Sequence, residues 1–154
     1  MHEIERKFLV YNDDFKKDLK PVHVIQGYLL YAEDGTARVR IVDGKSAVLS
    51  IKKDITSLTR WEFEYEIPVK DAEIMIKKLC VGKVVEKYRY FPEFDGKTWD
   101  VDEFLGDNSG LIIAEIELDS EEEYFAKPEW VGEEVTHDKR YLNAYLAEFP
   151  FINW

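Results

Sequence analysis

Charged residues recur two positions apart at several places in this chain. The first case is Glu3-x-Glu5-x-Lys7, close to the amino end. Three further pairs follow, which are Arg38-x-Arg40, Lys87-x-Arg89 and Glu115-x-Glu117. In a β-strand, residues two apart point to the same face, and two like charges side by side on that face repel one another. A pair of this kind therefore needs opposite charges or a ligand nearby.

On each expected strand, a set of charged residues occupies alternate positions and therefore shares one face. The acidic members are Glu3, Glu5, Glu62, Glu64, Asp100, Asp102, Glu115 and Glu117, and the basic members are Lys7, Arg38, Arg40, Lys52, Arg60, Lys87 and Arg89. Carboxylates side by side are tolerated best around a divalent cation, and ligands that are all oxygen suit Mg²⁺ or Mn²⁺. Lysine and arginine on facing strands are suited to phosphate oxygens.

Two arrangements of these strands fit the pattern. In the first, the charges form cross-strand salt bridges on a solvated sheet. In the second, a closed barrel turns the charges into its lumen, and helices cover the apolar outside. The opposite parity includes Val39, Ile41, Trp61, Phe63 and Tyr65, which favours the second arrangement because these side chains need cover.

The elements that position these residues are mostly strands joined by tight turns. Alternation predicts strands over 1–10, 23–31, 36–42, 46–53, 60–67, 84–91, 98–105 and 111–118, with turn signals at Asp43-Gly44 and Asp95-Gly96. Helical spacing predicts a helix over 71–80 capped by Asp71, and a last helix over 136–149. Ser120 and Glu123 form a capping-box pattern for a short helix that Pro128 ends. We expect one α+β domain over 1–154, with an antiparallel sheet or barrel.

Composition narrows the class of protein. The 154 residues contain 45% hydrophobic residues, enough for one folded core. A formal net charge of −11 argues against general nucleic-acid binding, although a local basic cluster can still bind an anion. The single cysteine, Cys80, excludes a disulfide within the chain. No stretch resembles a signal peptide or a membrane span, so we expect a cytoplasmic protein.

The motifs, taken in order, resemble the CYTH family, the triphosphate tunnel metalloenzymes. The resemblance rests on Glu3-x-Glu5-x-Lys7, Arg38-x-Arg40, Ser50-Ile51-Lys52, Arg60-x-Glu62-x-Glu64, Lys87-x-Arg89, Asp102-x-Phe104-x-Gly106 and Glu115-x-Glu117. It extends from Met1 to Asn143 and is strongest toward the small bacterial members. It implies an eight-stranded antiparallel tunnel that holds a small-molecule triphosphate with Mg²⁺ or Mn²⁺.

The resemblance also implies roles for individual residues. Metal-binding positions fall at Glu3, Glu5, Asp102, Glu115 and Glu117, and phosphate-binding positions at Lys7, Arg38, Arg40, Lys52, Arg60, Lys87 and Arg89. Glu3, Glu5, Lys7, Arg40 and Lys87 are the expected catalytic residues. Glu62, Glu64 and Asp100 line the tunnel without an assigned role.

The activity expected most is metal-dependent hydrolysis of inorganic tripolyphosphate to pyrophosphate and phosphate, in which water attacks the terminal phosphorus in line. Class IV adenylate cyclase and thiamine triphosphatase are alternatives within the family. A non-catalytic polyphosphate-binding module is an alternative of another class, although anion binding alone needs no carboxylate set. The sequence leaves a homodimer open.

One position departs from the family pattern. Some similar bacterial proteins have a lysine where this chain has Leu142, between Tyr141 and Asn143. This chain must then use Lys139 or Arg140 in its place, or do without a cation there. Trp130, His137 and Lys139 are the residues from which a small organic site at the tunnel mouth would be built. For Trp130, packing is the stronger expectation.

Overall fold

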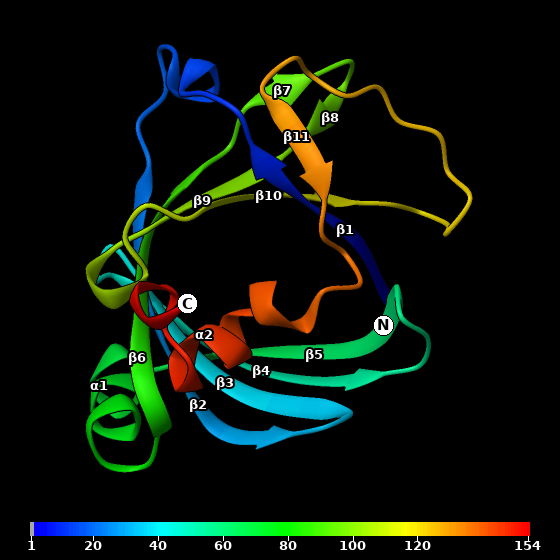
Figure 1. Cartoon of the computed structure of the whole chain (residues 1–154). Helices are drawn as coiled ribbons and strands as arrows, with labels where there is room; N and C mark the ends of the chain where they lie inside the picture. Colours follow the sequence, from blue (N-terminus) through cyan, green and yellow to red (C-terminus); the bar gives the residue numbers. More distant parts are fainter. Residues whose placement is uncertain (1) are drawn as a thin grey trace.

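Eight antiparallel strands of the computed structural model close into a barrel (Figure 1). The structure describes residues 2–154, and Met1, the first residue of the predicted first strand, lies outside them. The barrel order is β1 (His2–Val10), β5 (Thr59–Ile67), β4 (Ser46–Asp54), β3 (Gly35–Val42), β2 (Val22–Ala32), β6 (Val81–Tyr90), β9 (Asp100–Phe104) and β10 (Ile112–Glu117). Pairing of β10 with β1 closes the ring. This confirms the predicted eight-stranded antiparallel barrel.

The strand register brings the predicted charged residues together. Lys7 of β1 lies opposite Glu115 of β10, and Arg89 of β6 lies opposite Asp102 of β9. Since directly opposed residues of an antiparallel pair point to the same face, the charged parity of one strand meets that of the next all round the ring. That parity faces the lumen, so the barrel with a charged interior is the arrangement that this chain adopts.

Helix α1 (Val69–Lys78) covers part of the outer surface. Val39 and Ile41 are buried beneath it with Ala72, as the sequence predicts. Its close approach requires a glycine on β2, because a Cβ at Gly27 would overlap the sulfur of Cys80. The thiol of Cys80 thus packs directly against the backbone of β2. The prediction that Asp71 caps the helix is wrong, since α1 begins at Val69 after Pro68 and no side chain caps it.

The outer faces of β1, β9 and β10 are covered by loop segments rather than by a helix. Phe8, Trp99, Phe125 and Trp130 pack edge to face in one aromatic core there. The covering segments contain β7 (Glu93–Phe94), β8 (Lys97–Thr98), β11 (Val131–Glu134) and the 3₁₀ turn η1 (Asp14–Lys16). The short helix predicted after Ser120 is wrong, because residues 119–130 follow the barrel wall without helix. Burial of Phe125 and Trp130 determines the path of this segment, and the local capping pattern does not determine it.

The outer face of β5 has less cover than the sequence predicts. Trp61, Phe63 and Tyr65 are 43%, 45% and 55% exposed. Helix α1 packs on β2, β3 and β4 and does not reach them. The expectation that helices cover all of the apolar parity is therefore wrong for this strand.

The carboxyl-terminal segment enters the barrel. Helix α2 (Asn143–Glu148) lies between the upper and lower strands in Figure 1, after the 3₁₀ turn η3 (Lys139–Tyr141). Leu146 and Ala147 pack there against Val85, Phe104 and Ile113, which share the parity of the lumen charges. This apolar contact fills one end of the lumen. The chain also contains the 3₁₀ turns η2 (Gly106–Asn108) and η4 (Phe151–Asn153).

The helix predicted over 136–149 is much shorter than expected. Lys7 explains the difference, because its carbonyl accepts a hydrogen bond from Val135 N and its N–H donates to Thr136 Oγ1. These bonds hold residues 135 and 136 beside β1, and the chain then makes a turn in which Asp138 N donates to Val135 O. Leu142 is extended, with φ −74° and ψ 136°, so the helix begins only at Asn143. No helix within residues 2–154 is long and apolar enough to cross a membrane.

Candidate active site

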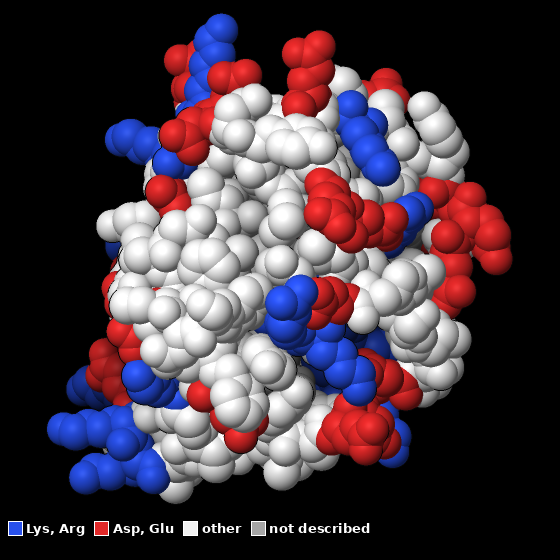
Figure 2. Space-filling view, viewed as in Figure 1, with Lys and Arg blue, Asp and Glu red and all other residues white. Residues whose placement is uncertain are grey.

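The part of the lumen that α2 leaves open is a cavity of about 430 Å³. On the face drawn in Figure 2, basic and acidic side chains meet near the middle, between the upper and lower strands. Nearly every predicted site residue lines the cavity, namely Glu3, Glu5, Lys7, Arg38, Arg40, Lys52, Arg60, Glu62, Glu64, Lys87, Arg89, Asp100, Glu115 and Glu117. Asp102 is the one predicted residue outside the lining, and it is buried beneath it.

One wall of the cavity is rich in carboxylates. Glu3 and Glu5 come from β1 and Glu115 and Glu117 from its neighbour β10, with Glu5 directly opposite Glu117. Burial and the neighbouring Glu5 raise the pKa of Glu3. Burial together with Glu3, Glu62 and Glu5 raises the pKa of Glu117. These shifts express the repulsion that the strand pattern predicted.

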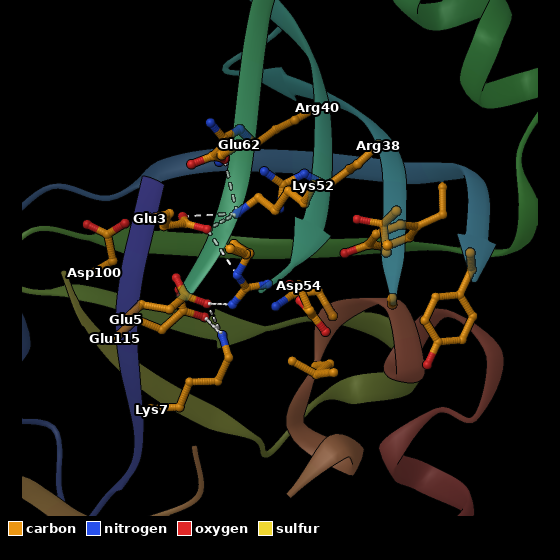
Figure 3. A pocket seen from close by; sticks show the side chains of 18 of the residues that line it. Glu3, Glu5, Lys7, Arg38, Arg40, Lys52, Asp54, Glu62, Asp100 and Glu115 are labelled. Carbon is orange, nitrogen blue, oxygen red and sulfur yellow. Dashed lines mark hydrogen bonds and ion pairs between the residues drawn. The ribbon is translucent and has the colours of Figure 1, made fainter. Parts of the chain in front are cut away.

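Lysine and arginine side chains are inserted between these carboxylates (Figure 3). Lys52 Nζ lies 2.8 Å from Glu3 Oε2 and 3.1 Å from Glu62 Oε1. Lys7 Nζ lies 2.6 Å from Glu115 Oε1 and 3.0 Å from Glu5 Oε1. Although burial opposes it, attraction to Lys7 and Arg60 holds the pKa of Glu5 well below its usual range. The acidic wall is therefore ionised around Glu5.

The facing wall carries two arginines with few partners. In an eight-stranded ring, strands four places apart lie opposite each other, which puts β3 across the lumen from β10. The Nε atoms of Arg38 and Arg40 are buried and have no hydrogen-bond partner within residues 2–154. Arg40 reaches only Glu64, at 3.6 Å, and burial together with Arg38 and Arg89 lowers its pKa. A buried guanidinium without a full set of acceptors is a site for an anion.

The floor of the cavity contains a buried ionic network. Asp102 Oδ2 accepts from Lys87 Nζ at 2.7 Å, and both Asp102 oxygens accept from Arg89. Although burial opposes it, Arg89 and Lys87 hold the pKa of Asp102 well below its usual range. Burial, with a contribution from Arg89, lowers the pKa of Lys87 to about 7, against the attraction of Asp102.

Three neutral residues at this floor escaped the sequence analysis. Gln26 Nε2 donates to Asn143 Oδ1 at 3.1 Å and to Tyr28 Oη at 3.2 Å, and Asn143 and Tyr28 line the cavity. Gln26 is fully buried. The only local indication was the single amide side chain of Gln26 within the apolar run His23–Tyr31. A search for charged residues does not detect neutral ones.

The residues considered at the mouth separate clearly. Lys139 lines the cavity with Leu142, whereas Arg140 pairs with Asp138 outside it. Of the two cations that the sequence offers, only Lys139 is in the lining of this cavity. Trp130 is buried in the outer aromatic core, as expected, and neither it nor His137 lines the cavity. The organic site considered at the mouth thus lacks two of its three residues.

Comparison with known proteins identifies the family. Residues 1–145 match the CYTH domain. The chain belongs to the CYTH-domain family. This confirms the resemblance drawn from the charged motifs.

Two relatives of this CYTH-domain chain are inorganic triphosphatases. The one from Acetivibrio thermocellus is 48% identical over 152 residues, covering 99% of this chain and 97% of the relative. The one from Nitrosomonas europaea is 39% identical over 152 residues, covering 96% and 97%. The solved structure of the inorganic triphosphatase NE1496 aligns with a TM-score of 0.67 at 36% identity, covering 94% of this chain and 93% of that one.

Proposed function

We propose that this chain is a metal-dependent inorganic triphosphatase that hydrolyses tripolyphosphate to pyrophosphate and phosphate. One observation carries the proposal, which is that Arg38 and Arg40, half-buried on the wall facing the carboxylates of β1 and β10, each have a buried Nε without a partner in the described residues. Such a lumen suits a strongly anionic ligand on one side and a cation on the other. The names of the two relatives agree with this reading.

The basic residues bind the phosphate chain. Arg38 and Arg40 present guanidinium donors to phosphate oxygens, while Lys7, Lys52 and Lys87 act as compact positive charges. Carboxylates already hold Arg60 and Arg89 in ion pairs, so these two arginines contribute positive charge to the wall from fixed positions. Phosphoryl transfer depends on positioning and on neutralising charge, and this set supplies both.

The carboxylate wall fits a hard divalent cation in its chemistry. Glu3, Glu5, Glu115 and Glu117 offer oxygen ligands, and the raised pKa values of Glu3 and Glu117 reflect unbalanced negative charge that a cation relieves. Within residues 2–154 no three acidic, histidine or cysteine side chains form a ready-made ligand group. Glu5 and Glu115 must therefore turn from Lys7 toward the ion. When bound, Mg²⁺ or Mn²⁺ supplies charge neutralisation to the phosphate oxygens.

Asp102 has a different part in this proposal from the one expected from the family pattern. Both of its oxygens accept hydrogen bonds from Lys87 and Arg89, and its side chain is 1% exposed. Three of the roughly four lone-pair sites of the Asp102 carboxylate are thus taken by Lys87 and Arg89. We assign Asp102 to holding those two cations in place beneath the substrate.

In the reaction, water attacks the terminal phosphorus in line and gives its proton to a carboxylate of the lumen. The bond from phosphorus to the bridging oxygen breaks, and pyrophosphate leaves with the electron pair. Lys7, Arg40 and Lys87 stabilise the charge that develops on the phosphate oxygens. Arg38 and Lys52 hold the leaving pyrophosphate. Glu62, Glu64 and Asp100 shape the charge of the wall.

Phosphate release measures this activity directly. Purified protein should release phosphate from tripolyphosphate when Mg²⁺ or Mn²⁺ is present, and should stop when a chelator is added. Glu5→Gln should lose at least about 100-fold in kcat while its melting temperature stays close to that of the wild type, because Lys7 and Arg60 keep their other carboxylates. Full activity in chelator or in Glu5→Gln would rule out the carboxylate wall as the metal site.

The same assay with other substrates, together with a binding measurement, distinguishes the alternative functions. A class IV adenylate cyclase would form cyclic AMP from ATP, and a thiamine triphosphatase would prefer thiamine triphosphate. A polyphosphate-binding module would bind tripolyphosphate and release no phosphate. A cytoplasmic location and the formation of a homodimer stay predictions.

A further inference from the structure

The ammonium group of Lys87 is held by two oxygens from distant parts of the sequence. Lys87 Nζ lies 2.7 Å from Asp102 Oδ2 and 2.8 Å from Asn143 Oδ1. In its charged form Lys87 has three N–H donors, and these acceptors take two of them. Lys87 lines the cavity, although its side chain is only 1% exposed, so the remaining donor is the one available to a ligand. Two fixed acceptors thus determine the direction of the third donor.

The orientation of the Asn143 amide is fixed by its neighbours. Its Oδ1 accepts from Lys87 Nζ and also from Gln26 Nε2, at 3.1 Å. Turning the amide over would set its NH₂ group against two other donors, so Lys87 and Gln26 would each lose this acceptor and keep only Asp102 and Tyr28 respectively. Gln26 is fully buried and its Oε1 has no partner within the described residues. The chain thus leaves one acceptor unsatisfied while it keeps the donor of Gln26 on Asn143.

Asn143 is also anchored from the other side. It is the first residue of α2, whose Leu146 and Ala147 are buried against Val85, Phe104 and Ile113. The carboxyl-terminal helix therefore delivers a single oxygen to the floor of the cavity, and apolar packing keeps it there.

We propose that Asn143 is a positioning residue that aims the Lys87 ammonium at the substrate phosphate. The inference rests on the proposed function, in which Lys87 stabilises charge on phosphate oxygens. Asp102 alone leaves Lys87 free to turn about one contact. With Asn143 added, the ammonium has one direction, and a catalytic group displaced by about 1 Å loses roughly 100-fold in rate.

A double-mutant cycle separates positioning from a general effect on folding. Single-turnover hydrolysis of tripolyphosphate with metal, with enzyme in excess and followed for hours, gives a rate even for slow variants. Asn143→Leu keeps the volume and removes the oxygen, and Asn143→Ala is the second variant in case leucine disturbs the fold. We expect kcat to fall about 10-fold to 100-fold, with KM changed less than about threefold. In a Lys87→Met background, Asn143→Leu should cost less than about twofold more.

Asn108 provides the matched control. It is also a buried asparagine, its Oδ1 accepts from Phe151 N at 2.8 Å, and it does not line the cavity. Asn108→Leu should lower the melting temperature at least as much as Asn143→Leu, with kcat within about threefold of the wild type. That result, with the non-additive cycle, supports the inference.

Two results would overturn it. If Asn143→Leu and Asn143→Ala keep the wild-type kcat, the oxygen is not needed to aim Lys87. If the loss is as large in the Lys87→Met background, Asn143 acts independently of Lys87. In both cases the wild type still cleaves tripolyphosphate and the proposed function stands. An inactive wild type would instead remove the proposed function and this inference together.

Discussion

Arg89 and Asp102 form a two-point ion pair beneath the cavity. Arg89 Nε lies 2.7 Å from Asp102 Oδ1, and Arg89 Nη2 lies 2.8 Å from Asp102 Oδ2. Asp102 is 1% exposed and is also the acceptor for Lys87. One carboxylate thus balances two buried cations, so the loss of its charge affects both.

Asp102→Asn should destabilise the protein by about 3–5 kcal/mol at pH 7, because it leaves buried cations uncompensated. The carboxylate has a folded pKa below its unfolded value of about 3.9. Its contribution is therefore full above about pH 4 and is lost as the pH falls through the folded pKa. Urea unfolding of both proteins at pH 7 and at pH 2.5 should show the difference shrinking. Asp107→Asn, which breaks an exposed pair with Lys83, should change stability little at either pH.

Arg40 and Arg89 should respond in opposite ways to truncation. Arg40 has one weak partner and is repelled by Arg38 and Arg89, so Arg40→Ala should keep or raise the melting temperature while KM for tripolyphosphate increases. Arg89→Ala removes the partner of Asp102 and should lower stability by about 3 kcal/mol or more, roughly 6–12 °C for a chain of this size. Differential scanning calorimetry of both variants measures this. Unfolding of Arg40→Ala would make Arg40 a structural residue instead.

The strand pattern was enough to predict the lumen because alternation fixes which residues share a face. It placed Lys7, Glu115, Arg89 and Asp102 on the charged face without any knowledge of the register. The register of the structure then pairs Lys7 with Glu115, and Arg89 with Asp102. The strand pattern did not tell whether that face meets water or the lumen. The order of the motifs settled this point, since local spacing is the same in both arrangements.

The predictions that were wrong concern segments whose conformation is set by distant contacts. The apolar spacing from Thr136 onward is helical in type, yet the backbone of Lys7 holds residues 135 and 136 beside β1 through two hydrogen bonds. Ser120 and Glu123 match a capping box, yet Phe125 and Trp130 are buried on the barrel and the segment that carries them forms no helix. Trp61, Phe63 and Tyr65 are exposed. Alternation along a strand therefore predicts which side chains share a face, but it does not predict which element covers that face.

Binding of tripolyphosphate should change the protonation of Lys87. With a pKa of about 7, Lys87 is largely neutral at pH 8 in the free protein and largely charged at pH 6. Phosphate beside it favours the charged form and raises its pKa. Metal-free binding, measured by calorimetry in buffers of different ionisation enthalpy, should take up close to one more proton in the wild type than in Lys87→Met at pH 8, and no more at pH 6. Equal uptake at pH 8 would mean that Lys87 is already charged without the ligand.

The last prediction concerns the choice of substrate. The cavity is lined mostly by charged side chains, with Tyr28 and Tyr31 as its aromatic residues. Trp130, a candidate for stacking on an organic group, is buried on the outside of the barrel. The donors therefore fit a phosphate chain, and a nucleoside at one end gains little from this wall.

Selectivity follows from differential binding in the transition state, so tripolyphosphate should be cleaved with a kcat/KM at least about 10-fold above that of ATP, GTP or thiamine triphosphate. Tripolyphosphate and ATP at equal concentration with metal, resolved by ion-exchange chromatography, should show tripolyphosphate consumed first and no cyclic AMP above a Glu5→Gln control. If ATP disappears first, a nucleoside contact must exist beyond the charged wall. The mouth, where Lys139 and Tyr31 line the cavity, is then the place to look for that contact, because the floor is already occupied by Lys87, Asp102 and Asn143.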